Sequence, residues 1–95
     1  MYNLNDELGN VLTFKLTSGV ELIATLLGLD EDGDQVTLGD PRLVIVNDSE
    51  LALIPYIFTG ESEEVIVPKS QIQTVVKTLQ TSADDYEKIL DPNQD

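Results

Sequence analysis

The chain has 95 residues, of which 41% are hydrophobic, and this predicts one domain with a modest core. It contains no cysteine, which excludes disulfides and thiolate metal sites, and no histidine, which excludes a nucleophile–histidine pair. Eighteen acidic residues against five basic ones give a formal net charge of -13, which repels phosphate backbones. Such a charge is typical of a protein that is kept in solution by self-repulsion, and the functional alternative is a partner with a basic surface.

Enzyme activity and membrane association are not expected. The carboxylates show no spacing that would pair two of them across a pocket, so we predict no catalytic residue and no cofactor. No apolar run approaches the length of about 20 residues that spans a bilayer, and the N-terminus has no signal-peptide pattern. We therefore expect a cytoplasmic protein.

The first elements are a short helical turn and a strand hairpin. Leu4 and Leu8 lie four residues apart, which predicts one helical turn within residues 1–10. From Val11, apolar and polar residues alternate, and the apolar side chains of one face are Leu12, Phe14 and Leu16. This alternation predicts a half-buried β-strand. After a turn at Gly19, residues 20–29 are apolar on both faces and contain Gly28, where the strand can bend. This predicts a small curled barrel rather than a flat sheet.

The next segment, "LDEDGDQV" at residues 29–36, concentrates carboxylates around a glycine. A calcium loop of the helix-loop-helix type needs glycine at its sixth position and a bidentate glutamate at its twelfth. Counting from Asp30, the glycine is fourth (Gly33) and Pro41 is twelfth. Asp-Gly between two β-like runs instead predicts a hairpin turn, and we expect no metal site.

Four further strands are predicted, at residues 36–46, 51–58, 65–67 and 72–77. "GDP" at residues 39–41 requires a bulge or a sheet edge, because proline donates no ladder hydrogen bond. Pro55 breaks the second of these strands. Turns are expected at "NDSE" (residues 47–50) and "PKSQ" (residues 68–71), with an acidic loop, "TGESEE", between them.

The tail changes to a helical period. Ser82 and Asp85 resemble a capping box, which would start the helix at this point. One face carries Ala83, Tyr86, Ile89 and Leu90. We expect this helix to dock on its own barrel, the alternative being a partner protein. The predicted organisation is an N-terminal segment (1–10), a barrel (11–78) and a C-terminal helix with tail (79–95).

The order of these elements resembles that of the Sm-like (LSm) family. Within this family, the sequence is most similar to the small acidic members attributed to marine cyanophages. The resemblance is carried by "LTSGVELIATLLGLDEDGDQVTL", residues 16–38, and by "VIVPKSQIQTVV", residues 65–76. It implies an all-β fold, a five-stranded, strongly bent antiparallel barrel of the small SH3-like type. An OB-type barrel is the structural alternative, because strand periodicity does not separate the two.

In that family, the loop after the second strand and the turn before the fifth bind RNA inside a ring. Carried over to this sequence, the possible RNA-binding residues are Asp34, Lys69 and Ser70. Asp34 stands where the family has asparagine, Pro68-Lys69 stands where it has Arg-Gly, and no aromatic residue lies in the loop to stack on a base. The family's aspartate, matched by Asp30, braces the loop. We therefore predict poor binding to single-stranded RNA.

The resemblance also implies a closed homo-oligomeric ring of five to seven subunits, in which the fourth strand of one copy pairs with the fifth of the next. The predicted interface residues are Val65, Ile66, Val67, Ile72, Thr74 and Val76. Two functions follow as hypotheses. The first is a non-enzymatic scaffold or adaptor that binds a basic protein partner, and the second is an RNA-binding module that works through the loops around Asp34 and Lys69.

Overall fold

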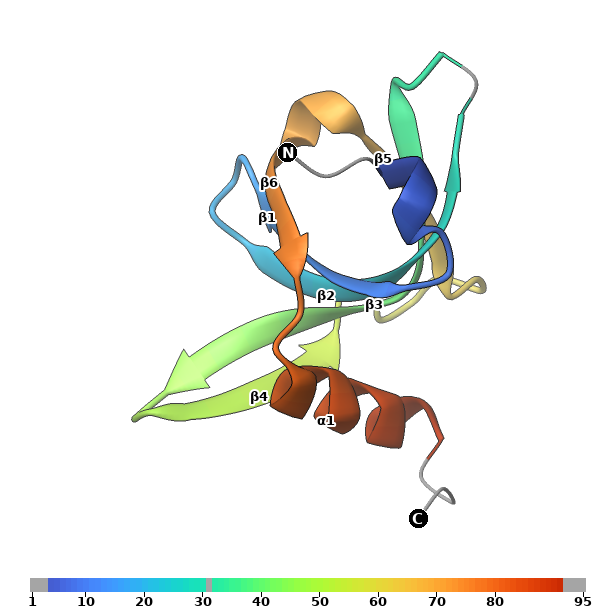
Figure 1. Cartoon of the computed structure of the whole chain (residues 1–95). Helices are drawn as coiled ribbons and strands as arrows, with labels where there is room; N and C mark the ends of the chain where they lie inside the picture. The colour runs from blue at the N-terminus through green and yellow to red at the C-terminus, as the bar shows by residue number, and fades with distance from the viewer. Residues whose placement is uncertain (1–3, 31, 92–95) are drawn as a thin grey trace.

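A computed structural model describes residues 4–30 and 32–91 as one curved antiparallel sheet with a helix beside it (Figure 1). The elements in chain order are η1 (Leu4–Glu7), β1 (Val11–Leu16), β2 (Glu21–Leu29), β3 (Gln35–Asn47), β4 (Glu50–Pro55), β5 (Glu64–Pro68), η2 (Lys69–Gln71), β6 (Ile72–Lys77) and α1 (Gln80–Leu90). The predicted β-rich class, the N-terminal turn and the C-terminal helix are confirmed.

The sheet has six strands, where the resemblance predicts five. Its order is β4-β3-β2-β1-β6, and β5 lies off this path, paired with β3. β3 serves two partners in succession, β5 through Gln35–Gly39 and β4 through Arg42–Asn47. The prediction of five strands is wrong, because the segments expected at residues 51–58 and 65–67 form two separate strands, β4 and β5, and residues 56–63 lie outside the sheet between them.

The turns follow the predicted chemistry. Gly19 and Gly33 have φ angles of 96° and 73°, which glycine adopts without steric cost. Asp48 and Ser49 have φ angles of 49° and 72°, as in the primed turn of a two-residue hairpin. The expected irregularity at residues 39–41 is also present, because Asp40 has a φ angle of 49° and the register between β2 and β3 shifts beside it.

The core lies inside the curve of the sheet. Its fully buried side chains are Leu12, Phe14, Leu22, Ala24, Leu26, Val36 and Leu38. The alternation predicted for the first strand is therefore confirmed. β2 is covered on both faces only in its first half, because Ile23 is 3% exposed whereas Leu27, further along the same strand, is 45% exposed.

α1 begins earlier than predicted. The strand β6 ends at Lys77, and the extended conformation of Leu79 takes the N-cap position, so Ser82 and Asp85 lie inside the helix and the predicted capping box is wrong. Tyr86 is fully buried, which confirms that the helix docks on its own sheet, but Ile89 and Leu90 on the same predicted face are 42% and 37% exposed. Neither α1 nor any other helix among the described residues is long and apolar enough to cross a membrane.

Candidate functional site

The two loops that correspond to the RNA-binding loops of the family lie against each other. The amide of Lys69 donates a hydrogen bond to the carbonyl oxygen of Asp34 at 2.8 Å. The Lys69 Nζ lies 3.7 Å from the point that a Cβ on Gly33 would occupy, so the ammonium group covers the hairpin turn. Ser70 follows in η2 and is exposed. The structure therefore brings the residues Asp34, Lys69 and Ser70 into one neighbourhood.

Asp30 organises the β2–β3 turn. Its carboxylate Oδ1 accepts a hydrogen bond from the amide of Asp34 at 2.9 Å, and its carbonyl accepts one from the amide of Gly33 at 3.0 Å. The amide of Asp30 donates to the carbonyl of Gln35 at 3.2 Å. This is the bracing role that the resemblance implies for Asp30. Glu31, the remaining carboxylate of the turn, lies outside the described residues.

The charge of this loop pair opposes binding to phosphate. The carboxylates of Asp30, Asp32 and Asp34 are all exposed, and the neighbouring loop supplies the ammonium group of Lys69. A nucleic-acid backbone would meet an excess of negative charge here. In the described part of the chain, no three Asp or Glu side chains are grouped closely enough to hold a metal ion.

The strands expected to join neighbouring subunits each have one unpaired edge. β5 pairs with β3 and β6 pairs with β1, and within residues 4–30 and 32–91 no ladder joins β5 to β6. Val67 belongs to the core, and Val65 and Ile72 pack against it. By contrast, Ile66 is 64% exposed, Val76 is 46% exposed, and Thr74 is exposed. The predicted interface residues thus divide into core-facing and solvent-facing sets.

A carboxyl pair that the sequence did not suggest lies where β3 changes partner. The amide of Asp40 donates to the carbonyl of Glu63 at 2.7 Å, which brings the two side chains together beside a cavity of about 200 Å³. A hydrogen bond to the Asp40 carboxyl and repulsion from its charge raise the pKa of Glu63, and Arg42 partly offsets this effect. The Asp40 Oδ1 is buried and has no hydrogen-bond partner among the described residues.

Tyr86 is the main contact between α1 and the sheet. Its hydroxyl lies 2.9 Å from the carbonyl oxygen of Gly39, 3.0 Å from that of Asp40 and 3.3 Å from the Oγ1 of Thr25. Burial raises the pKa of the Tyr86 hydroxyl, so it remains a donor through the neutral range. The helical period of the tail identified Tyr86 as an inward-facing residue, but its hydrogen-bond partners are too distant in sequence to be predicted from it.

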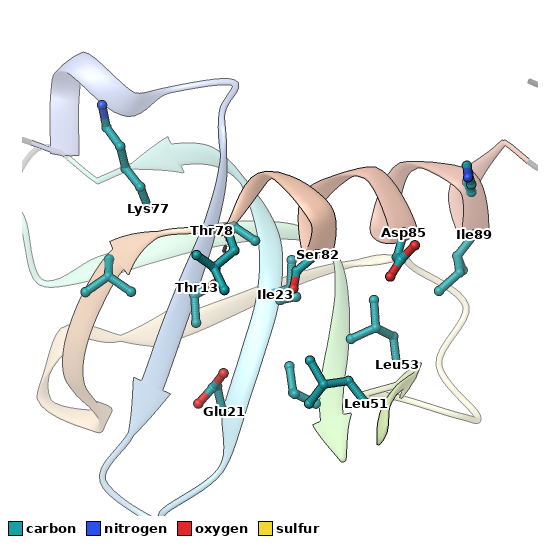
Figure 2. A pocket seen from close by; sticks show the side chains of 14 residues that line it. Thr13, Glu21, Ile23, Leu51, Leu53, Lys77, Thr78, Ser82, Asp85 and Ile89 are labelled. Atoms are coloured by element: carbon teal, nitrogen blue, oxygen red, sulfur yellow. Dashed lines mark hydrogen bonds between the residues drawn. The ribbon is translucent and has the colours of Figure 1, made fainter. Parts of the chain in front are cut away.

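A groove runs beside this contact, between α1 and the β3–β4 hairpin (Figure 2). It has a volume of about 500 Å³. Ile23 and Val44 line it from the sheet, Leu51 and Leu53 from β4, and Asp85 and Ile89 from α1. This groove was not predictable from the sequence, because its walls come from six separate elements, β1, β2, β3, β4, β6 and α1.

Comparison with solved structures identifies the fold. No protein-family model and no curated protein sequence matches the chain. The chain is similar to the P. aerophilum SmAP1 heptamer, at 17% identity and a TM-score of 0.56, over 80% of this chain and 88% of that one. It is equally similar to a heptameric archaeal Sm protein, at 17% identity and a TM-score of 0.56, over 80% and 96% of the two chains.

A third match is a chain in the crystal structure of the NatC complex bound to CoA, at 19% identity and a TM-score of 0.55, over 90% of this chain and 96% of that one. The resemblance to cyanophage proteins finds no support in these three matches. Similarity at this level of identity concerns the fold. The chain has the Sm-like fold.

Proposed function

We propose that this chain is a non-enzymatic Sm-like module that assembles into a closed ring of five to seven copies and acts in the cytoplasm as a scaffold or adaptor for a basic protein partner. The observation that carries the proposal is that β5 and β6 each have an edge with no partner strand among residues 4–30 and 32–91, as does the outer edge of β4. Exposed backbone donors and acceptors at a sheet edge can recruit another strand, so natural proteins block such edges or pair them. Two of the structurally similar proteins are heptamers, which supports a ring.

The side chains along these edges suit association. Ile66 on β5 and Val76 on β6 are apolar and solvent-exposed, and burying them between copies would be favourable. Glu61 and Glu63 precede β5 and Glu64 is its first residue, and their charge there discourages uncontrolled pairing. Because every copy carries a net charge of -13, salt should favour assembly.

Sedimentation velocity tests the ring. We expect the wild-type chain to sediment as a closed oligomer at micromolar concentration in moderate salt. Ile66→Glu should shift it toward monomer, whereas Leu8→Glu, which places the same charge on an exposed apolar residue near η1, should not. A wild-type chain that remains monomeric in moderate salt would contradict the ring.

RNA binding remains a second candidate because of one contact. The hydrogen bond from the amide of Lys69 to the carbonyl of Asp34 joins the two loops that bind RNA in the family. Against it stand the surrounding carboxylates and the absence of an aromatic residue between residues 29 and 36. We expect poor binding at physiological salt.

Gel shifts with U-rich and A-rich oligonucleotides over a range of salt concentrations separate the two functions. Sub-micromolar binding that prefers one sequence would establish the RNA-binding function. In that case Lys69→Ala should weaken binding and flatten its salt dependence, whereas Lys88→Ala on α1 should change neither. Purification of the chain with its partners from the native host would also test the predicted location and the proposed basic partner.

A further inference from the structure

The two strands that the proposed ring joins carry opposite charges at one end. Of the five basic residues of the chain, Lys77 is the one that lies in β5 or β6, and it is the last residue of β6. It is exposed, and in Figure 2 its side chain extends away from α1. β5 begins at Glu64, directly after Glu63, and both of these residues are exposed. The end of one strand is therefore basic, and the start of the other is acidic.

These charges favour one direction of pairing between copies. In the antiparallel direction, the acidic start of β5 meets the basic end of β6 of the next copy. In the parallel direction with the strands aligned, Lys77 would lie beside Lys69, and like charges directly opposite each other are destabilising. The ladders within the described sheet are all antiparallel, and sheets of a single type are over-represented among proteins. We therefore expect the antiparallel direction.

The faces of the two strands restrict the register. Val65 on β5 and Val75 on β6 pack against the core, whereas Ile66 on β5 and Thr74 on β6 are exposed. Residues directly opposite each other on neighbouring strands have their side chains on the same face of the sheet, and a slip of one residue would exchange the two faces. Val65 of one copy is therefore expected opposite Val75 of the next.

This register also matches the lengths of the strands. It pairs residues 64–68 with residues 72–76 from end to end, and the next residues in the same alignment are Glu63 and Lys77. A slip of two residues would keep the faces but leave part of β5 or β6 without a partner. The alignment with the most paired residues thus places Lys77 opposite Glu63.

Glu63 faces a like charge within its own copy. The amide of Asp40 donates a hydrogen bond to the carbonyl oxygen of Glu63 at 2.7 Å, which holds the two acidic residues together. The Asp40 Oδ1 is buried and has no hydrogen-bond partner among the described residues. Arg42 offsets the repulsion only in part, and its Nη1 donates to the carbonyl of Pro41 at 3.4 Å. An ammonium group from a neighbouring copy would stabilise the charged form of Glu63.

We propose that Lys77 of each copy forms an ion pair with Glu63 of the next copy, and that this pair sets the direction and register of the contact between β5 and β6. The inference rests on the ring of the proposed function and names the residues that select its closing contact. The acidic start of β5 repels strands without a cation at this position and accepts the strand that carries Lys77. Salt screens an ion pair in contact less than it screens repulsion between whole copies, so salt still favours assembly.

Charge reversal tests the ion pair in sedimentation velocity. Glu63→Lys and Lys77→Glu should each raise the protein concentration at half assembly by at least about tenfold, because each places like charges opposite one another. The double variant keeps the net charge of -13 and should return this concentration to within about threefold of the wild-type value. Glu61→Lys and Lys88→Glu change the net charge equally but lie outside the pair, so each should change it by less than about threefold.

A neutral variant separates the ion pair from folding. Glu63→Gln removes the repulsion from Asp40 within one copy and also removes the ion pair between copies. The unassembled chain should therefore gain stability near neutral pH, while the concentration at half assembly rises about threefold. A variant that was only damaged in its fold would lose stability as well as assembly.

The chain has no cysteine, so introduced cysteines report the register directly. Glu63→Cys with Lys77→Cys should give a ladder of covalent oligomers on a non-reducing gel after oxidation, because directly opposite residues of two strands lie close to disulfide distance. Each single variant can form only a dimer. Lys69→Cys with Lys77→Cys, the pair that a parallel contact would bring together, should give no ladder.

The outcomes separate this inference from the ring itself. A wild-type ring with charge-reversed variants that assemble equally well, or a ladder from the Lys69 and Lys77 pair, would overturn the inference and leave the ring intact. A double charge-reversed variant that is folded by circular dichroism but stays monomeric would also overturn it. A wild-type chain that is monomeric in moderate salt, with no ladder from any cysteine pair, would refute both proposals.

Discussion

Removal of the Tyr86 hydroxyl tests whether it anchors α1. Tyr86→Phe keeps the buried ring and deletes the group that faces two backbone carbonyls, at 2.9 and 3.0 Å. Phenylalanine has nearly the same shape, so the change leaves no large cavity, and the effect measured is that of the hydrogen bonds.

The expected loss follows from the donor count. The hydroxyl has one proton and therefore donates one full hydrogen bond. Such a bond contributes about 1 kcal/mol net to stability, but removing only the donor leaves a buried carbonyl unpaired, which costs about 1–3 kcal/mol. We therefore expect the free energy of unfolding to fall by about 2 kcal/mol. For a domain of this size, that corresponds to a melting temperature lower by roughly 8–16 °C.

Urea and thermal unfolding followed by circular dichroism would measure this loss. Tyr56→Phe is the matched control, because it also removes a tyrosine hydroxyl. Tyr56 is half-buried and packs against the core at the start of the 56–63 loop, away from α1. If Tyr86→Phe unfolds at the same midpoint as the wild-type chain, the hydroxyl does not hold the helix on the sheet.

Three further predictions concern the loops. The Asp40 carboxyl raises the pKa of Glu63 above its ordinary value of 4.5, so the stabilisation from protonated Glu63 is complete below pH 4.5 and is lost as the pH rises through the raised pKa. Glu63→Gln should therefore become more stable relative to the wild-type chain as the pH approaches neutrality. A difference in urea midpoints that does not change with pH would contradict this. Asp32→Asn with Asp34→Asn should change the free energy of unfolding by less than about 0.5 kcal/mol, whereas a calcium-dependent rise in melting temperature that this variant abolishes would instead establish a metal site. Gly33→Ala should destabilise by about 1–2 kcal/mol in the same melts, because its φ angle is 73°.

Features set by neighbouring residues were predictable from the sequence. The alternation of Leu12, Phe14 and Leu16 placed the first strand and its buried face correctly. Asp-Gly and "NDSE" marked the two hairpin turns, because these residues tolerate positive φ angles. The proximity of Asp34 and Lys69 followed from the resemblance, which fixed the order in which the strands meet.

Features set by distant contacts were not predictable. The sequence predicts the acidic loop at residues 59–64, but nothing local shows that the strand expected at residues 51–58 already ends at Pro55, because proline is compatible with a strand edge. Helix α1 starts at Gln80 because β6 ends just before it, a boundary that outweighs the local signal at Ser82. The contact of Tyr86 with Gly39 spans 47 residues, and no periodicity reports such a pairing.

The loop between β4 and β5 determines how the chain tolerates changes in length. Both ends of the 56–63 loop are fastened to adjacent residues of β3, through Tyr56 N to Pro41 O at 3.1 Å and Asp40 N to Glu63 O at 2.7 Å. Residues inserted at the exposed Thr59–Gly60 step would leave both ladders of β3 intact. Each doubling of such a loop costs only about 0.6 kcal/mol. This step is therefore the natural place to insert an epitope or a targeting peptide, displayed beside the edge of β5.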